Sequence, residues 1–184
     1  MNFEFTEEQE EIRMAVREFA EKEFTPELAH ECDQKEEFPM ELYKNAAELG
    51  FIGLHFEEEY GGQGYGLTEL CLSIEELCRA DSTLGTAILI GGFGSDLIHM
   101  FGTEEQMAKY LPKVASGEWI SSGAFTEPAR GSDITKMATA AVKDDDGYTI
   151  NGGKTLISNA PIADFGIILC QTDPDVQHRG SSLL

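Results

Sequence analysis

The chain has 184 residues, of which 41% are hydrophobic, enough to bury a core in one domain or in one domain and part of a second. Acidic residues outnumber basic ones 34 to 13, for a formal net charge of −21. Such a surface repels phosphate backbones and anionic lipids, so nucleic acid and membrane are excluded as expected partners. An anionic small ligand is not excluded, because backbone N–H groups with one or two cations hold a phosphate locally.

The four cysteines give no sign of a metal or redox site. Cys32, Cys71, Cys78 and Cys170 form no C-x-x-C pair and have no histidine at metal-ligand spacing, so no metal site is expected. Cys71 and Cys78 lie in an apolar helical pattern, which favours two buried side chains on one helix face. We expect reduced thiols in a cytoplasmic protein.

No targeting or membrane-spanning segment is expected. The first residues, MNFEFTEEQEEIR, have neither a basic start with an apolar core nor an Arg-rich leader, and no apolar run approaches a membrane span. The pattern predicts a soluble protein.

Apolar residues recur at helical spacing through the first two-thirds of the chain. Thr6 and Gln9 have capping-box spacing and open a helix to about residue 24, which Pro26 closes. Thr103 and Gln106 repeat that spacing and open a shorter helix that ends near Gly117. Further helices are predicted at 39–49, 67–80 and 83–101.

The helix predicted at 83–101 is apolar almost all round and contains three glycines, at 91, 92 and 94. Glycine weakens a helix, so these positions indicate close approach of a neighbouring backbone or ligand, or a kink. We favour packing against another helix.

The period changes after residue 117. Residues 142–150 read as two strands around an acidic turn at Gly147, and 167–172 reads as a further short strand. Helices first and strands afterwards indicate two layers or two domains, with a boundary near 115–120.

Residues 124–133, AFTEPARGSD, combine an edge strand that ends at Pro128 with a Gly-Ser-Asp turn. The hydroxyls of Thr126 and Ser132, with the backbone N–H groups around them, would suit a ligand rich in acceptors. A turn that satisfies its own backbone explains the same residues, and composition alone favours it.

Residues 150–159 begin with a strong turn signal at Asn151 and Gly152, followed by a strand predicted from Lys154 to Ser158. In such a strand Ser158, Leu156 and Lys154 share one face of the sheet. Without further context, an ordinary hairpin with a surface lysine is the favoured interpretation of this stretch.

The chain resembles the acyl-CoA dehydrogenase family over essentially its whole length. The resemblance rests on motifs that occur in the family's order at nearly constant spacing: 117–120 (GEWI), 126–128 (TEP), 131–133 (GSD), 146–152 (DGYTING), 154–159 (KTLISN) and 163–164 (AD). The helical part adds 5–9 (FTEEQ), 49–51 (LGF), 59–62 (EYGG) and 101–106 (FGTEEQ).

The resemblance implies an α+β fold, with an all-α domain at 1–117 followed by an incomplete β-barrel-like domain at 118–184. It implies FAD as the cofactor, an acyl-CoA substrate oxidised to the trans-2-enoyl-CoA, an electron-transferring flavoprotein as electron acceptor, and a homo-oligomer. The residues that it assigns to the site are Phe125 and Thr126 at the pyrimidine edge of the flavin, Gly131 and Ser132 at FAD and acyl-CoA, and Leu156, Ile157 and Ser158 beside the flavin ring.

The chain departs from the family pattern in three places. Leu156 stands where many members have an aromatic residue, and Arg130 stands where a small residue is commoner. Members are also about twice as long, and the segment that carries their catalytic base has no counterpart here. We therefore assign no catalytic residue: Glu75 and Glu76 adjoin a packed helix, and Glu127 belongs to the TEP turn.

Two other functions stay open from the sequence. One is an oxidase or flavin monooxygenase of the same fold, in which oxygen replaces the electron-transferring flavoprotein. The other is a non-catalytic module that binds acyl-CoA or a partner chain through its acidic helical half.

Overall fold

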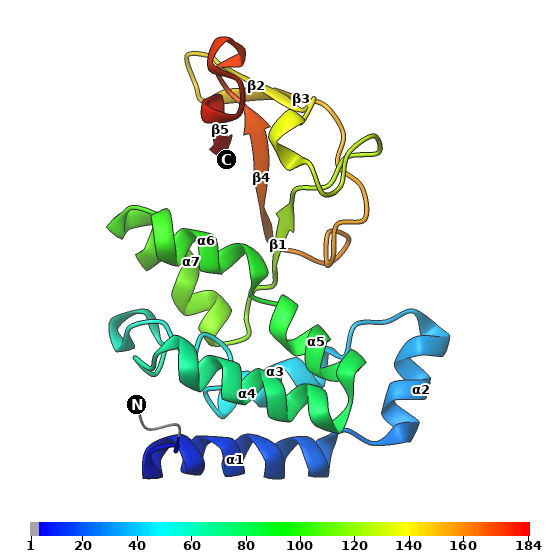
Figure 1. The fold of residues 1–184 in the computed structure, drawn as a ribbon. Helices are drawn as coiled ribbons and strands as arrows, with labels where there is room; N and C mark the ends of the chain where they lie inside the picture. Colours follow the sequence, from blue (N-terminus) through cyan, green and yellow to red (C-terminus); the bar gives the residue numbers. More distant parts are fainter. Residues whose placement is uncertain (1–3) are drawn as a thin grey trace. The chain divides into compact units, whose positions relative to one another are not determined.

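The computed structural model describes residues 4–184, apart from the side chains of residues 177 and 178. The chain forms two compact units, one extending to Ile120 and the other spanning Ser121–Leu184. Figure 1 shows helices in the blue to green part of the chain and the labelled strands in the yellow-green to red part. The predicted α+β class, helical first and sheet second, is confirmed, whereas the domain limit between 117 and 118 stays a prediction.

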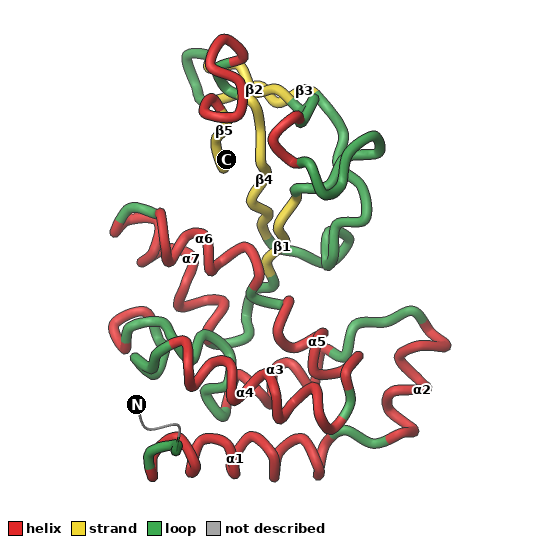
Figure 2. Tube along the Cα trace, in the orientation of Figure 1, coloured by secondary structure: helices red, strands yellow, loops and turns green. Residues whose placement is uncertain are grey.

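In Figure 2 the helices of the helical unit are the red segments in the N-terminal part of the tube. Its helices are α1 (Glu7–Glu23), α2 (Pro26–Lys35), α3 (Met40–Glu48), α4 (Leu67–Ala80), α5 (Ser82–Ile90), α6 (Phe93–Phe101) and α7 (Glu104–Ala115), with a 3₁₀ turn η1 (Glu58–Tyr60) between α3 and α4. α4 lies against both α1 and α5, and α6 lies against α7.

Both predicted capping boxes are present. The Gln9 amide donates to the Thr6 hydroxyl over 3.2 Å and the Thr6 amide to the Gln9 side chain over 3.0 Å. Thr103 and Gln106 make the same pair of bonds at the start of α7. Each box satisfies two amides that have no partner inside the helix, which is why these starts could be predicted locally.

The segment after α1 differs from its prediction. Pro26 was expected only to close the first helix, but it opens α2, and the Thr25 hydroxyl accepts from the Leu28 amide over 3.2 Å. None of the α2 side chains is buried. The apolar spacing that predicts a helix is therefore absent, and proline at a first helical position was the available signal.

The single helix expected at 83–101 is interrupted at Gly91 and Gly92, which separate α5 from α6. A Cβ on Gly91 would lie 2.3 Å from the Tyr43 ring of α3, and one on Gly85 would lie 2.8 Å from the α4 backbone at Cys78. The predicted close packing against other helices is confirmed at Gly91, and the backbone turns there as well.

The expectation that no apolar run approaches a membrane span needs correction. In the described residues, Ser82–Phe101 is long and apolar enough by length and composition, with a mean hydropathy of 1.4. This is weak evidence for a span, because the segment is two helices whose side chains at Leu84, Ile88 and Ile98 are buried in the helical unit.

The buried face of α4 is not the predicted one. Cys71 is exposed and Cys78 only half-buried, so the expected pair of buried cysteines is wrong. The buried positions are instead Leu72, Ser73, Glu76 and Leu77. Apolar spacing could not indicate this face, because two of its four residues are polar.

Glu76 is buried on α4 because two arginines pair with its charge. Its side chain is only 4% exposed and accepts a bidentate pair of bonds from Arg17 on α1, at 2.9 and 2.5 Å. Arg79 adds a bond of 2.8 Å from the same helix. Arg17 and Arg79 lower the pKa of Glu76 to about 2, against the opposing effect of burial. The α1–α4 contact is thus tied by a charge network.

The sheet unit contains β1 (Ser121–Ala124), β2 (Ala140–Lys143), β3 (Tyr148–Asn151), β4 (Phe165–Gln171) and β5 (Ser181–Leu183), with 3₁₀ turns η2 (Ile134–Lys136) and η3 (Pro174–Gly180). The order is β1-β4-β2-β3, with β5 also on β4. β1 and β2 run parallel to β4, whereas β2–β3 and β4–β5 are antiparallel. The predicted hairpin and the predicted strand near 167–172 are confirmed, and β1 lies at the edge of the path, as expected.

Two strand predictions near the candidate site are wrong. β1 ends at Ala124, before the expected end at Pro128, and the chain turns so tightly that Glu127 and Arg130 exchange two backbone hydrogen bonds of 2.9 Å. Residues 154–158 form no strand, and Leu156 adopts a left-handed conformation with φ of 55°. A strand cannot continue through that conformation.

Candidate functional site

The residues assigned to the site all lie in loops of the sheet unit. Phe125 and Thr126 directly follow β1 and are half-buried. Gly131 and Ser132 follow the tight turn and are exposed, and a Cβ on Gly131 would meet nothing within 4 Å. Residues 156–158 precede β4, with Leu156 and Ser158 exposed and Ile157 half-buried.

Three hydrogen bonds bring the segments 125–127 and 154–158 together. The Thr155 amide donates to the Thr126 carbonyl over 2.9 Å. The Lys154 ammonium donates to the Phe125 carbonyl and to Glu127 Oε1, each over 3.0 Å. Segments nearly thirty positions apart in the sequence are therefore neighbours. None of these bonds includes Gly131 or Ser132.

Glu127 is buried behind this junction. Its Oε2 accepts from the Ala138 amide over 2.7 Å and its Oε1 from the Thr139 amide over 2.8 Å, in addition to the Lys154 ammonium. Burial would raise the pKa of Glu127, but the bonds from Thr139, Ala138 and Lys154 outweigh it and lower that pKa to about 2. The sequence predicted neither the burial of Glu127 nor its ion pair with Lys154, which was read as a surface lysine.

Neither buried glutamate suits the role of catalytic base. A base must take up a proton near neutral pH and reach its substrate, whereas the pKa values of Glu76 and Glu127 are both about 2 and their oxygens are already bonded. Glu75, the neighbour of Glu76 on α4, is exposed. That this chain contains no catalytic residue stays a prediction.

Leu156 combines two unusual features. Its side chain is 89% exposed, and its φ of 55° lies in the left-handed region that non-glycine residues seldom adopt. Asn159 adopts the same region, with φ of 64°. Such conformations cluster at ligand sites, but they also occur at helix ends, as at Glu36 after α2. In a strand, the sheet unit would cover one face of this segment. The observed turn instead leaves the side chains of Leu156 and Ser158 exposed.

The hydroxyls of Thr126 and Ser158 have no protein partner in the part of the chain that the structure describes. A hydroxyl both donates and accepts, so each has its full hydrogen-bonding capacity available to a ligand. The site therefore offers two hydroxyls, an exposed Leu156 and the open space beside Gly131. This donor set fits a polar, aromatic cofactor with many acceptors.

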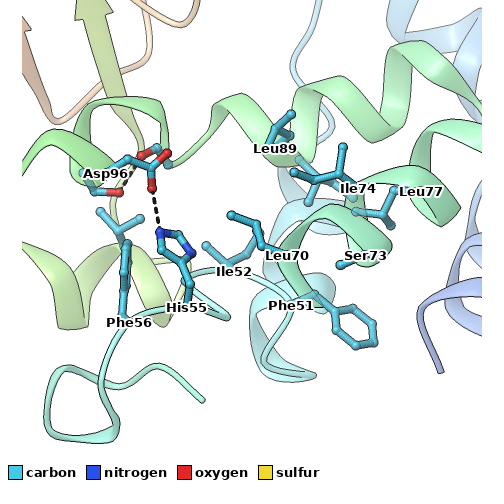
Figure 3. A pocket seen from close by; sticks show the side chains of 15 residues that line it. Phe51, Ile52, His55, Phe56, Leu70, Ser73, Ile74, Leu77, Leu89 and Asp96 are labelled. Atoms are coloured by element: carbon cyan, nitrogen blue, oxygen red, sulfur yellow. Dashed lines mark hydrogen bonds and ion pairs between the residues drawn. The ribbon is translucent and has the colours of Figure 1, made fainter. Parts of the chain in front are cut away.

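A separate cavity lies within the helical unit, and Figure 3 shows its lining. Its walls are mainly apolar, with residues such as Ile52, Leu70 and Ile74. The polar lining residues include His55, whose Nε2 lies 3.1 Å from Asp96 Oδ1. The cavity contains none of the residues assigned to the cofactor. In the described residues no group of three or more His, Cys, Asp or Glu side chains is placed to hold a metal ion.

Comparisons with known proteins match both units. The family model described as "Acyl-CoA dehydrogenase, N-terminal domain" matches residues 6–118, and the one described as "Acyl-CoA dehydrogenase, middle domain" matches residues 122–184. The short-chain specific acyl-CoA dehydrogenase of Clostridium acetobutylicum is 40% identical over 183 residues, which are 99% of this chain and 48% of that protein.

Solved structures agree with the sequence matches. The acyl-CoA dehydrogenase of Geobacillus kaustophilus superposes with a TM-score of 0.89 at 37% identity, over 100% of this chain and 49% of that one. The FAD complex of PigA superposes with a TM-score of 0.91 at 33% identity, over 100% and 48%. The chain spans about half the length of the curated relatives it matches.

Proposed function

Because this chain belongs to the acyl-CoA dehydrogenase family, we propose that its sheet unit binds FAD and contributes to oxidation of an acyl-CoA thioester to the trans-2-enoyl-CoA. The observation that carries the proposal is the junction of the segments 125–127 and 154–158, since these are the two stretches that the resemblance assigns to the flavin. The structural likeness to the FAD complex of PigA supports the same cofactor.

We assign the following roles to the chain's own residues. The Phe125–Thr126 backbone and the Thr126 hydroxyl bind the pyrimidine edge of the flavin. The Ser158 hydroxyl donates a hydrogen bond towards the flavin N5, with Leu156 and Ile157 beside the ring. When bound, FAD supplies the hydride acceptor, and donors around it stabilise the electron density that reduction adds.

Gly131 and Ser132 are assigned to the phosphate-bearing parts of FAD and acyl-CoA. The open space beside Gly131 supports this role, because a phosphate chain can approach an exposed glycine backbone closely. The exposed Leu156 offers less cover over the flavin than an aromatic residue would, so solvent shielding there is expected to be weaker.

The remaining features of the proposal concern the whole reaction. Electrons pass to an electron-transferring flavoprotein, the active assembly is a homo-oligomer, and the protein is cytoplasmic. The resemblance assigns the base that removes the substrate α-proton to a segment with no counterpart in this chain, and Glu76 and Glu127 are engaged in ion pairs. The 184-residue chain by itself is therefore expected not to turn over acyl-CoA.

A titration of FAD with the purified chain, followed by flavin fluorescence, tests the cofactor assignment. Thr126→Val and Ser158→Ala each remove one hydroxyl and are expected to weaken binding about tenfold, which corresponds to roughly 1.4 kcal/mol per lost hydrogen bond. Thr149→Val is the matched control, because Thr149 lies on β3 and its hydroxyl donates to Asp144. Equal affinities for all four proteins would refute the assigned contacts.

A further inference from the structure

We propose that Lys154 and Glu127 form a buried latch that aims the backbone donor of Thr126 at the cofactor, which makes Lys154 a positioning residue of the site. The identity of the ligand rests on the proposed function, whereas the latch itself rests on the geometry of the sheet unit. Both residues lie in motifs that carry the family resemblance, but neither is among the residues assigned to the cofactor.

The two side chains of the latch are buried and paired with each other. Lys154 is 8% exposed and Glu127 5% exposed at the side chain, and their 3.0 Å contact joins two charges away from solvent. Both carboxylate oxygens are also anchored, one by the Ala138 amide and the other by the Thr139 amide. The Lys154 ammonium thus contacts both an anchored carboxylate and the Phe125 carbonyl, each over 3.0 Å.

The chain on either side of Lys154 is held as well. A Cβ on Gly152 would lie 2.5 Å from Thr139 Cα, so the backbone that leads into Lys154 rests directly on the residue whose amide binds Glu127. On the other side, the Thr155 amide binds the Thr126 carbonyl. Lys154 therefore has little freedom to leave the Phe125 carbonyl.

The consequence for the site follows from the geometry of the peptide unit. The Phe125 carbonyl and the Thr126 N–H belong to one planar, trans peptide, so they point in opposite directions. Lys154 holds that carbonyl, and it thereby directs the Thr126 N–H away from the latch. The Thr126 amide has no protein partner in the described part of the chain, which leaves it available to an acceptor on the ligand.

A buried ion pair is a poor device for stability alone, because well-packed uncharged residues often replace one at no loss. A variant that replaces both charges can therefore test a positioning role of the pair separately from a role in folding. Lys154→Met by itself leaves a buried carboxylate unpaired and can unfold the unit. The double variant Lys154→Met with Glu127→Gln removes both charges and keeps an acceptor for one of the two neighbouring amides, those of Ala138 and Thr139.

The test compares this double variant with Lys143→Met, a matched substitution at an exposed lysine of β2. Hydrogen exchange of the Thr155 amide measures the latch without any ligand, and FAD titration measures its effect on the site. We expect a folded double variant with Thr155 exchange at least tenfold faster, FAD binding about tenfold weaker, and unchanged protection in β2 and β3. Lys154→Arg, which keeps a charged donor, is expected to retain most of the wild-type protection and affinity.

The outcomes separate the two proposals. If the wild-type chain does not bind FAD, the proposed function fails, and the exchange of Thr155 still decides whether the latch exists. If the folded double variant keeps wild-type Thr155 protection, the latch is overturned. If Thr155 exchange accelerates while FAD affinity stays at the wild-type value, Lys154 has no positioning role and the inference also fails.

Discussion

Glu127→Ala is expected to unfold the sheet unit while the helical unit keeps its fold. The substitution leaves the Lys154 ammonium buried without its counter-charge and removes the acceptor of the Ala138 and Thr139 amides. Removing one partner of a buried ion pair costs about 3–5 kcal/mol. A unit of this size has a stability of only about 3–10 kcal/mol, so the loss is comparable to the whole stability of a unit in the lower half of that range.

A two-dimensional amide NMR spectrum of the Glu127→Ala chain measures this outcome residue by residue. Resonances of β1 to β5 are expected to collapse into the unfolded range, and those of α1 to α7 to stay dispersed. Asp145→Ala is the control, because Asp145 is an exposed acid in the β2–β3 turn and its loss should change stability by less than about 0.5 kcal/mol. A dispersed sheet spectrum for Glu127→Ala would show that the ion pair is dispensable.

Glu76→Ala is expected to lower the free energy of unfolding of the helical unit by about 2–4 kcal/mol. The variant loses three charge-assisted hydrogen bonds and opens a cavity between α1 and α4, while Arg17 and Arg79 recover part of the cost by hydration at the surface. Urea unfolding followed by the fluorescence of Trp119, the single tryptophan, measures the change. The adjacent, exposed Glu75→Ala should be nearly neutral, and a loss of equal size in both variants would contradict the role of the network.

The same carboxylate predicts an acid dependence. The pKa of Glu76 falls from 4.5 to about 2 on folding, so the unfolded chain binds this proton more readily than the folded chain. The stabilisation is complete above about pH 5 and is lost as pH falls towards about 2, with a total near 3 kcal/mol. Glu76→Ala should therefore flatten the fall in stability between pH 5 and pH 2 relative to the wild type, and an unchanged slope would contradict the lowered pKa.

Local patterns predicted the elements that depend on local bonds. The capping boxes at Thr6 and Thr103 and the turn at Gly147 need only neighbouring residues, so sequence spacing suffices to find them. The helix α4 was also predicted, but its buried face was not, because Glu76 is buried only through Arg17, 59 positions away. Spacing carries no information about such a partner.

The candidate site shows the same division. Phe125, Thr126 and Ser158 are assigned to the site only by the family resemblance, and in the structure hydrogen bonds join the segments 125–127 and 154–158 that contain them. The strand predicted at 154–158 was wrong because tertiary contacts of Lys154 and the left-handed Leu156 override the local β pattern. The ion pair of Lys154 with Glu127 joins positions 27 residues apart, and each residue alone looks like an ordinary surface charge.

Amide hydrogen exchange of the whole chain with and without saturating FAD reports where the cofactor binds. A flavin site in the sheet unit predicts slower exchange at Phe125 and Thr126, at Gly131 and Ser132, and through 156–158, with the helices α1 to α4 unchanged. Protection confined to the helical cavity around His55, or no protection at any FAD concentration, would contradict a flavin site in the sheet unit.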